Sequence, residues 1–192
     1  MPKVIDHDER RRELMEASWQ VIAAEGLESL TMRKIAAAAG CTTGRLTHYF
    51  ANREELVLAA LKAAYDAAAI RMAAALEADG TPRERLLTML EETLPLDEVR
   101  LREWKIWIAF WGAAAADASL ASENDTRHDR WREALLPLIR EIVPESDADY
   151  EATRLIGIVD GLGLQAAIRP TAQNRNRAQT ALATHLRSLE KG

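Results

Sequence analysis

Three tryptophans in one predicted helix are the residues best suited to bind a small molecule. Trp104, Trp107 and Trp111 stand at positions i, i+3 and i+7, which places three indole rings on one helical face, with Phe110 beside them. Core packing would explain such a face, provided that each indole N–H finds a partner. A pocket would explain it as well, because a quaternary ammonium gains about 0.5–2 kcal/mol of cation–π attraction per ring.

An aspartate in a later apolar stretch is the second unusual feature. Asp160 lies within residues 155–164, where a carboxylate is costly to bury unless it is paired. Its charge could balance that of a cationic ligand, or it could form a salt bridge or a helix-end contact at a subunit interface. The candidate effector-binding residues are Tyr65, Trp104, Trp107, Phe110, Trp111 and Asp160.

The sequence contains no constellation expected of an enzyme. The four histidines are scattered, and the single cysteine, Cys41, has no nearby base. Asp125, His128 and Asp129 have a loose metal-like spacing without a third strong ligand elsewhere. We therefore expect no catalysis, no metal and no cofactor. The lone cysteine also excludes an internal disulfide and fits a reducing cytoplasm.

Composition predicts an all-helical protein. The chain of 192 residues is 48% hydrophobic, which is enough for a real core, and no stretch alternates apolar and polar residues long enough to form a strand. Its N-terminus is charged, and no run of about 18 uncharged apolar residues occurs. We expect a soluble cytoplasmic protein without a membrane segment.

The charge distribution limits where DNA could bind. The formal net charge is −5, but residues 1–62 hold equal numbers of basic and acidic residues, so the excess acid lies in residues 63–192. An acidic surface disfavours nonspecific contact with phosphates. Any DNA contact should therefore be confined to the N-terminal part.

Helical periodicity, capping residues and breakers predict about nine helices. Residues 122–125 are expected to form a polar junction, and residues 144–149 a turn. The expected helices cover residues 10–25, 32–39, 43 to about 49, 53–78, a segment starting near 82, 96–116, 130–143, 150–168 and a last one ending near 189.

Two of these helices, between Thr31 and Phe50, are predicted to form a helix-turn-helix. Thr31 can cap the first, Gly40 ends it, and Thr42 or Thr43 can cap the second. Any helical hairpin could have such a turn. The wider sequence is more specific, because the segments SLTMRKIAAAAG (29–40), TGRLTHYF (43–50) and NREEL (52–56) resemble the DNA-binding signature of the tetracycline-repressor (TetR) family.

The resemblance implies specific DNA contacts. It places Thr31 and Arg33 at the start of the first helix of the motif, where they would contact DNA. The residues of the recognition helix in the major groove would be Thr42, Thr43, Gly44, Arg45 and Thr47. His48 and Tyr49 would then contact phosphates, and Arg53 would be the cation at the start of the next helix.

The residue types suit these roles. Arg45 could bind the O6/N7 edge of guanine with two hydrogen bonds, which contributes about 1–3 kcal/mol of discrimination. Gly44 lets the backbone approach DNA closely. Thr47 stands where the family commonly has tyrosine, and His48 or Tyr49 could pack inside the protein instead.

Two later segments, EWKIWIAFW (103–111) and IVDGLGLQAA (158–167), resemble the BetI branch of the family, whose namesake responds to choline. The resemblance implies a homodimer through helices at about 127–143 and 148–168. A stripe of Leu135, Leu138, Ile139 and Ile142 agrees with this, and Gly157, Gly161 and Gly163 would allow close helix approach. The branch usually has tryptophan where Gly163 stands, so the pocket or the interface should differ from that of the choline responder.

Together these features predict a TetR-type transcription regulator, most simply a repressor released from double-stranded DNA by a small-molecule effector. Residues 1–52 would bind DNA, residues 53–192 would bind effector and dimerise, and helix 53–78 would connect the two. A dimer implies a palindromic operator with half-sites about 34 Å apart or somewhat more. The alternatives are activation, and a DNA-binding or protein-interaction dimer that senses no ligand.

Overall fold

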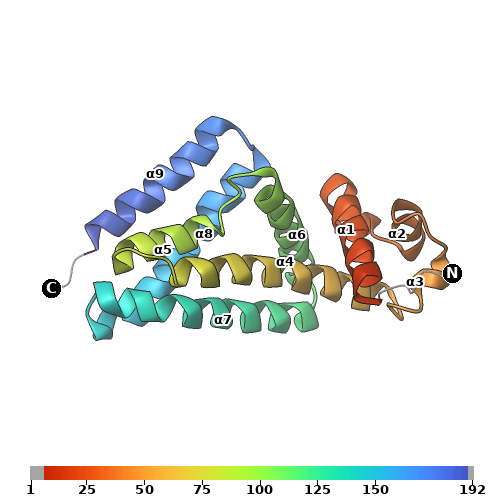
Figure 1. The fold of residues 1–192 in the computed structure, drawn as a ribbon, viewed down its shortest axis with the longest axis horizontal. Coiled ribbons are helices and arrows are strands. Elements are labelled where there is room, and N and C mark those ends of the chain that lie inside the picture. Colours follow the sequence, from red (N-terminus) through yellow and green to blue (C-terminus); the bar gives the residue numbers. More distant parts are fainter. Residues whose placement is uncertain (1–6, 190–192) are drawn as a thin grey trace.

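The part of the chain that is described, residues 7–189 of a computed structural model, is entirely helical. The predicted all-α architecture is thereby confirmed. Figure 1 shows α1 to α3 at one end and the other helices in a larger body, with α4 running from the first group into the second. The helices are α1 (His7–Glu25), α2 (Met32–Ala38), α3 (Thr43–Leu46), α4 (Arg53–Leu76), α5 (Pro82–Glu91), α6 (Glu98–Ala114), α7 (Ala118–Ile142), α8 (Ala148–Ile168) and α9 (Ala172–Ser188), with 3₁₀ turns η1 (Leu27–Ser29) and η2 (Glu145–Asp147).

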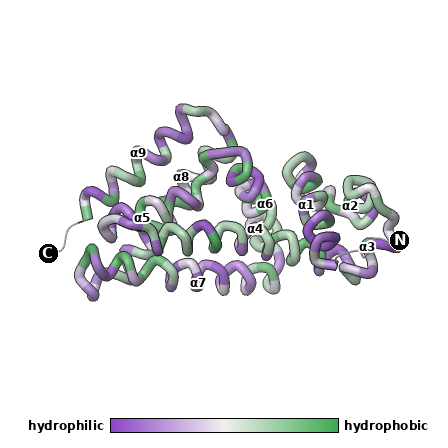
Figure 2. Tube along the Cα trace, in the orientation of Figure 1, coloured by the Kyte–Doolittle hydropathy of each residue, from purple (hydrophilic) through white to green (hydrophobic). Residues whose placement is uncertain are grey.

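None of the helices within residues 7–189 combines the length and the apolar character needed to cross a bilayer. Figure 2 instead shows purple hydrophilic residues recurring between green hydrophobic ones along α7 and α9. This alternation is typical of helices that lie on a core with one face and meet water with the other.

Local capping sets the bounds of the helix-turn-helix. The hydroxyls of Thr31 and Thr42 each accept a hydrogen bond at 3.2 Å from the backbone amide three residues later. Gly40 lies between α2 and α3 with a φ of +59°, a conformation that suits glycine. Helix α3 ends at Leu46, and residues 47–49 continue as a turn, so the recognition helix is shorter than predicted.

Two clusters of buried side chains hold the helices together. The first joins α1 to α3 with the first half of α4 and with α6, and it includes Phe50 and Phe110. The second joins the end of α4 with α5, α7, α8 and α9. Because α1 packs against α6, buried contacts cross the expected boundary between residues 52 and 53. The division into two domains at that point stays a prediction.

Helix α7 differs most from the prediction. It is continuous over Ala118–Ile142, so the expected polar junction at residues 122–125 is wrong. Asp117 begins the helix by accepting hydrogen bonds from the amides of Ser119 and Leu120, at 2.8 and 3.1 Å. The polar residues that suggested a loop lie on the solvent and cavity faces of this helix.

The apolar stripe of α7 does not face outward. Leu135, Leu138 and Ile139 are at most 1% exposed and pack in the second core cluster, with Ile142 also buried. Their expected place at a subunit interface is therefore wrong for these side chains. Helix α7 buries this face against α5 and α8 of its own chain.

A buried ion pair braces α4 against α6. Arg71 of α4 donates to both carboxylate oxygens of Glu103 on α6, at 3.0 and 2.6 Å, and to Glu92 at 3.1 Å. The Glu103 side chain is 1% exposed, and burial raises the pKa of its carboxyl against the opposing effect of Arg71. Removing Arg71 would cost about 3–5 kcal/mol, because the charge of Glu103 would be left buried without this partner.

Helices α6 and α8 meet where Trp104 lies on Gly163. A Cβ atom at Gly163 would come within 2.0 Å of a ring carbon of Trp104. The indole N–H of Trp104 donates to the carbonyl of Thr93 at 2.6 Å, which fixes the ring in this place. Gly163 therefore serves packing within one chain rather than close approach of a partner, and the ring of Trp104 fills the space that a larger residue would need.

Replacing Gly163 with alanine should destabilise the protein by about 1–3 kcal/mol, because the buried ring cannot move aside without strain. Urea unfolding measures this change. Gly112→Ala is the matched control, since Gly112 is an exposed glycine of α6 whose added Cβ would meet nothing within 4 Å. The control should be neutral or stabilising by up to about 1 kcal/mol. Equal stability of the two variants would contradict the packing argument.

Candidate effector cavity and DNA-binding surface

An aromatic cavity of about 280 Å³, which we call the inner cavity, lies among α4, α6, α7 and α8. Five of the six residues predicted for an effector site line it, namely Tyr65, Trp104, Trp107, Trp111 and Asp160. Phe110 does not line it and instead packs in the first core cluster. Sequence reasoning missed Trp131, Arg127 and His128 of α7, which complete the wall. They lie close to the segment that was expected to be a loop.

The rings of the inner cavity contact one another in a chain. Tyr65 stacks on Trp107 with ring centroids 5.6 Å apart and an interplanar angle of 24°. Trp104 meets Trp107 and Trp111 edge-on, with centroids 5.5 and 5.6 Å apart. Both interpretations of the tryptophan face therefore hold in part, because Trp104 and Trp107 are buried in the core while all three tryptophans also line the cavity.

A guanidinium lies over the ring of Tyr65. The Arg127 guanidinium carbon is 4.5 Å from the centroid of Tyr65, and Arg127 also pairs with Glu123 at 2.5 Å. Burial raises the pKa of Tyr65 to about 12, although the nearby Arg127 opposes this shift. The Tyr65 hydroxyl is therefore neutral at physiological pH.

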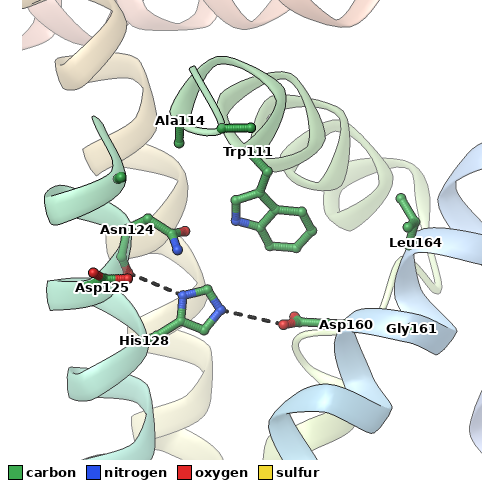
Figure 3. A pocket seen from close by; sticks show the side chains of 10 residues that line it. Trp111, Ala114, Asn124, Asp125, His128, Asp160, Gly161 and Leu164 are labelled. Carbon is green, nitrogen blue, oxygen red and sulfur yellow. Dashed lines mark hydrogen bonds and ion pairs between the residues drawn. The ribbon is translucent and has the colours of Figure 1, made fainter. Parts of the chain in front are cut away.

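Asp160 and His128 form a loose pair at the edge of the inner cavity. Their side chains approach to 3.5 Å, and the other ring nitrogen of His128 lies 3.2 Å from the carbonyl of Asn124. Figure 3 shows this pair beneath the indole of Trp111, with the three side chains coming from α8, α7 and α6. Asp160 is 31% exposed at its side chain, so it is a partly solvated carboxylate rather than a buried one.

A second, open hollow of about 510 Å³, the outer hollow, adjoins the pair, and Figure 3 shows side chains that line it. Trp111, His128 and Asp160 line both the outer hollow and the inner cavity. These three side chains are therefore the shared wall between the solvent side and the aromatic interior.

The predicted DNA-binding residues lie at the other end of the molecule and are mostly exposed. The hydroxyls of Thr31 and Thr42 accept backbone hydrogen bonds as caps, which leaves their own hydrogens to donate to phosphate. Thr47 donates its hydroxyl hydrogen to the carbonyl of Gly44 at 2.8 Å, so its oxygen can only accept from DNA. The exposed members of the set are Thr31, Arg33, Thr42, Thr43, Gly44, Arg45, Thr47 and His48.

Tyr49 and Arg53 are partly buried and have partners within the protein. The ring of Tyr49 lies 5.2 Å from that of His7. Arg53 donates through Nε to the carbonyl of Leu30 at 2.7 Å and through one terminal nitrogen to that of Leu27 at 2.8 Å. Arg53 thus ties the start of α4 to the loop before α2, and its contact with phosphate stays a prediction.

An exposed helix-turn-helix joined by one long helix to a body with an aromatic cavity defines a helix-turn-helix transcription regulator. The chain belongs to the tetR family of bacterial regulatory proteins. Residues 14–60 match that family, and residues 82–190 match the C-terminal region of BetI-type transcriptional repressors.

Individual relatives agree with this assignment. The chain is 34% identical to the HTH-type transcriptional regulator PksA of Bacillus subtilis (98% of this chain, 94% of the relative) and 30% identical to BetI 1 of Chromohalobacter salexigens (93% and 89%). A transcriptional regulator of Rhodococcus sp. Rha1 superposes with a TM-score of 0.84 at 30% identity (93% and 95%). A regulator of Saccharomonospora viridis in complex with choline does so with 0.85 at 26% identity (94% and 97%).

The pair of Asp160 and His128 predicts a pH dependence. Hydrogen bonding to Asp160 raises the pKa of His128 above its ordinary value of 6.5, although burial opposes the shift. The pair therefore stabilises the fold fully below about pH 6.5 and loses this contribution as pH rises through the pKa of the folded state. Asp160→Asn should lower the midpoint of the His128 ring-proton titration measured by NMR. Asp129→Asn, an exposed change on α7, should leave it in place, and a midpoint unchanged by Asp160→Asn would disprove the pairing.

Proposed function

We propose that this chain is a dimeric repressor that binds a palindromic operator and is released by a small cationic effector in the inner cavity. The proposal is supported most directly by the path of α4 through the molecule. This helix supplies Tyr65, Met72 and Leu76 to the cavity wall, and it begins beside the helix-turn-helix. A ligand that shifts α4 would therefore shift the recognition helix, as linkage between two sites requires.

Three hydrogen bonds support a tight coupling of α4 to the DNA-binding end. Arg53 is bound to the backbone carbonyls of Leu27 and Leu30, and the indole N–H of Trp19 in α1 donates to the carbonyl of Ala60 at 2.9 Å. Movement of α4 would have to break these bonds or carry the helix-turn-helix along.

The chemistry of the inner cavity favours a cationic effector. Aromatic rings supply π faces that attract a cation, and Asp160 supplies a carboxylate. The Saccharomonospora viridis relative is in complex with choline, a quaternary ammonium of a size that the cavity can hold. A cation at Asp160 would displace protonated His128 as its partner.

The dimer is proposed to form through the outward face of α8. This face carries an exposed stripe of apolar and small residues at intervals of seven, four, three and four, the spacing of a helix–helix seam. Its members are Tyr150, Gly157, Gly161, Leu164 and Ile168, of which Ile168 is 71% exposed. A two-fold axis along this face would present two recognition helices to a palindromic operator.

Arg45 is expected to supply most of the sequence discrimination. Arg45→Ala should weaken binding to an operator selected from random DNA by about ten- to a hundredfold, through loss of contacts to a guanine edge. Fluorescence anisotropy at fixed ionic strength measures the affinity, and light scattering checks that the dimer persists. Arg177→Ala, on the exposed surface of α9, should leave operator affinity unchanged. Retention of specific binding by the Arg45 variant would refute its role.

Asp160 is expected to bind the cationic centre of the effector. Asp160→Asn should weaken choline binding about tenfold, through loss of the charge attraction, while Asp129→Asn should not. In the unchanged protein, choline affinity should rise as the pH increases through the pKa of His128, which lies above its ordinary value of 6.5, because the cation competes with protonated His128. Calorimetry measures both effects.

The release step needs its own measurement. Saturating choline should lower operator affinity about 5- to 150-fold at constant ionic strength. Binding of choline without a change in operator affinity would disprove release by this effector. If the chain binds DNA but binds neither choline nor another small cation, it would instead be a dimer without ligand sensing.

A further inference from the structure

Two of the residues predicted to contact DNA use their hydrogen-bond donors within the protein. Arg53 donates through two of its nitrogens to the backbone carbonyls of Leu30 and Leu27, at 2.7 and 2.8 Å. Thr47 gives its hydroxyl hydrogen to the carbonyl of Gly44 at 2.8 Å. Phosphate oxygens accept hydrogen bonds, so DNA beside the end of the recognition helix would gain from a donor on another element of the chain.

Helix α1 brings such a donor to this place. His7 and Arg11 are exposed, and their spacing of four residues puts them on one face of α1. The ring centroid of His7 lies 5.2 Å from that of Tyr49. Arg11 donates through one terminal nitrogen to the carbonyl of Tyr49 at 3.3 Å, and its guanidinium carbon lies 4.6 Å from the ring centroid of Phe50. These contacts place the start of α1 beside the end of the recognition helix (Figure 1).

We infer that Arg11 of α1 binds a backbone phosphate of the operator, next to the phosphate expected at Tyr49. The inference rests on the proposed function, since it takes the exposed helix-turn-helix as the DNA-binding surface. A guanidinium matches a phosphate group with paired, charge-assisted hydrogen bonds, and a contact of this kind fixes the protein on the duplex without reading a base. The DNA-binding surface then includes the first turns of α1 in addition to residues 31–53.

Two acidic residues of α1 pair with arginines other than Arg11. Glu13 pairs with Arg10 of its own helix, and Glu16 pairs with Arg102 of α6 at 2.5 Å. Arg11 instead lies over an aromatic ring and beside a backbone carbonyl, and neither of these contacts neutralises its charge. A phosphate would add the opposite charge that the ring and the carbonyl do not supply.

The salt dependence of operator binding tests this contact. Each phosphate that a cation neutralises contributes about −0.9 to the slope of log affinity against log salt concentration. Arg11→Gln should therefore reduce the magnitude of this slope by about one per subunit, and should weaken binding to the operator and to unrelated DNA by the same factor. Fluorescence anisotropy of the full chain at several salt concentrations, with an operator selected from random DNA and without effector, measures both quantities.

Three further variants separate charge from position. Arg11→Lys keeps the positive charge and should restore most of the slope. Arg12→Gln removes an equal charge from an exposed neighbour, which stands one turn before Glu16 on the face of α1 that meets α6, and should change the slope by less than half as much. Urea unfolding shows whether each variant folds. If Arg11→Gln folds poorly, Arg11→Met keeps the apolar stem over Phe50 and takes its place.

A change on the DNA identifies the phosphate. Operators that carry a single uncharged methylphosphonate are titrated with the unchanged chain and with Arg11→Gln. At one position in each half-site, the modification should weaken binding of the unchanged chain and have little further effect on the variant, because the contact is already lost. The absence of any such position would contradict the inference.

The other outcomes have distinct meanings. An unchanged slope with Arg11→Gln, or an equal fall with Arg12→Gln, would overturn the inference and leave the repressor of the proposed function standing. A loss of preference for the operator over unrelated DNA, at an unchanged slope, would show that Arg11 only positions the recognition helix, and would also overturn it. Failure of the unchanged chain to prefer any selected DNA would overturn the operator binding of the proposed function, and this inference with it.

Discussion

The ion pair between Arg71 and Glu103 fixes the geometry on which the cavity depends. A carboxylate that is 1% exposed needs a partner with matching geometry, and the bidentate guanidinium of Arg71 provides it. Since Glu103 directly precedes Trp104 and lies one turn from Trp107, the pair sets the rotation of α6 relative to α4. The tryptophans consequently face the same space as Tyr65. The contact of Trp104 with Gly163 then fixes the distance to α8.

Side chains of both charge signs line the resulting cavity. Arg127 is held over Tyr65 by a cation–π contact and by Glu123, and Asp160 is held loosely by a histidine. An aromatic cavity without charges would bind hydrophobic molecules of many kinds. One that also holds guanidinium and carboxylate groups favours molecules that can satisfy these charges, and rejects those that leave them unpaired.

Local signals predicted most of the fold, while long-range contacts determined what was missed. Capping threonines and glycines gave the helix-turn-helix, because their hydrogen bonds involve residues only a few positions apart. Residues 122–125 were mistaken for a junction, because a polar helix that faces water and a cavity lacks apolar periodicity. Arg127, His128 and Trp131 were missed as cavity residues, because their contacts with Tyr65, Asp160 and Trp111 join positions far apart in the sequence. Asp160 was selected from the sequence because it is an isolated acid in an apolar stretch. Glu103 is the more deeply buried carboxylate, but its partner Arg71 lies 32 positions away in the sequence.

The position of α4 explains how one small ligand could act on a distant DNA surface. Arg53 holds the helix at the DNA-binding end, and Arg71 holds it against α6 beyond the cavity residue Tyr65. A rigid helix fixed at both ends cannot bend at its centre without loss of hydrogen bonds, so it moves as a unit or not at all. An effector can then bias the position of the recognition helix only to the extent that it binds one position of α4 more tightly than the other. Differential contact with Tyr65, rather than affinity alone, is therefore the property that would distinguish an effector from a passive ligand of the same cavity.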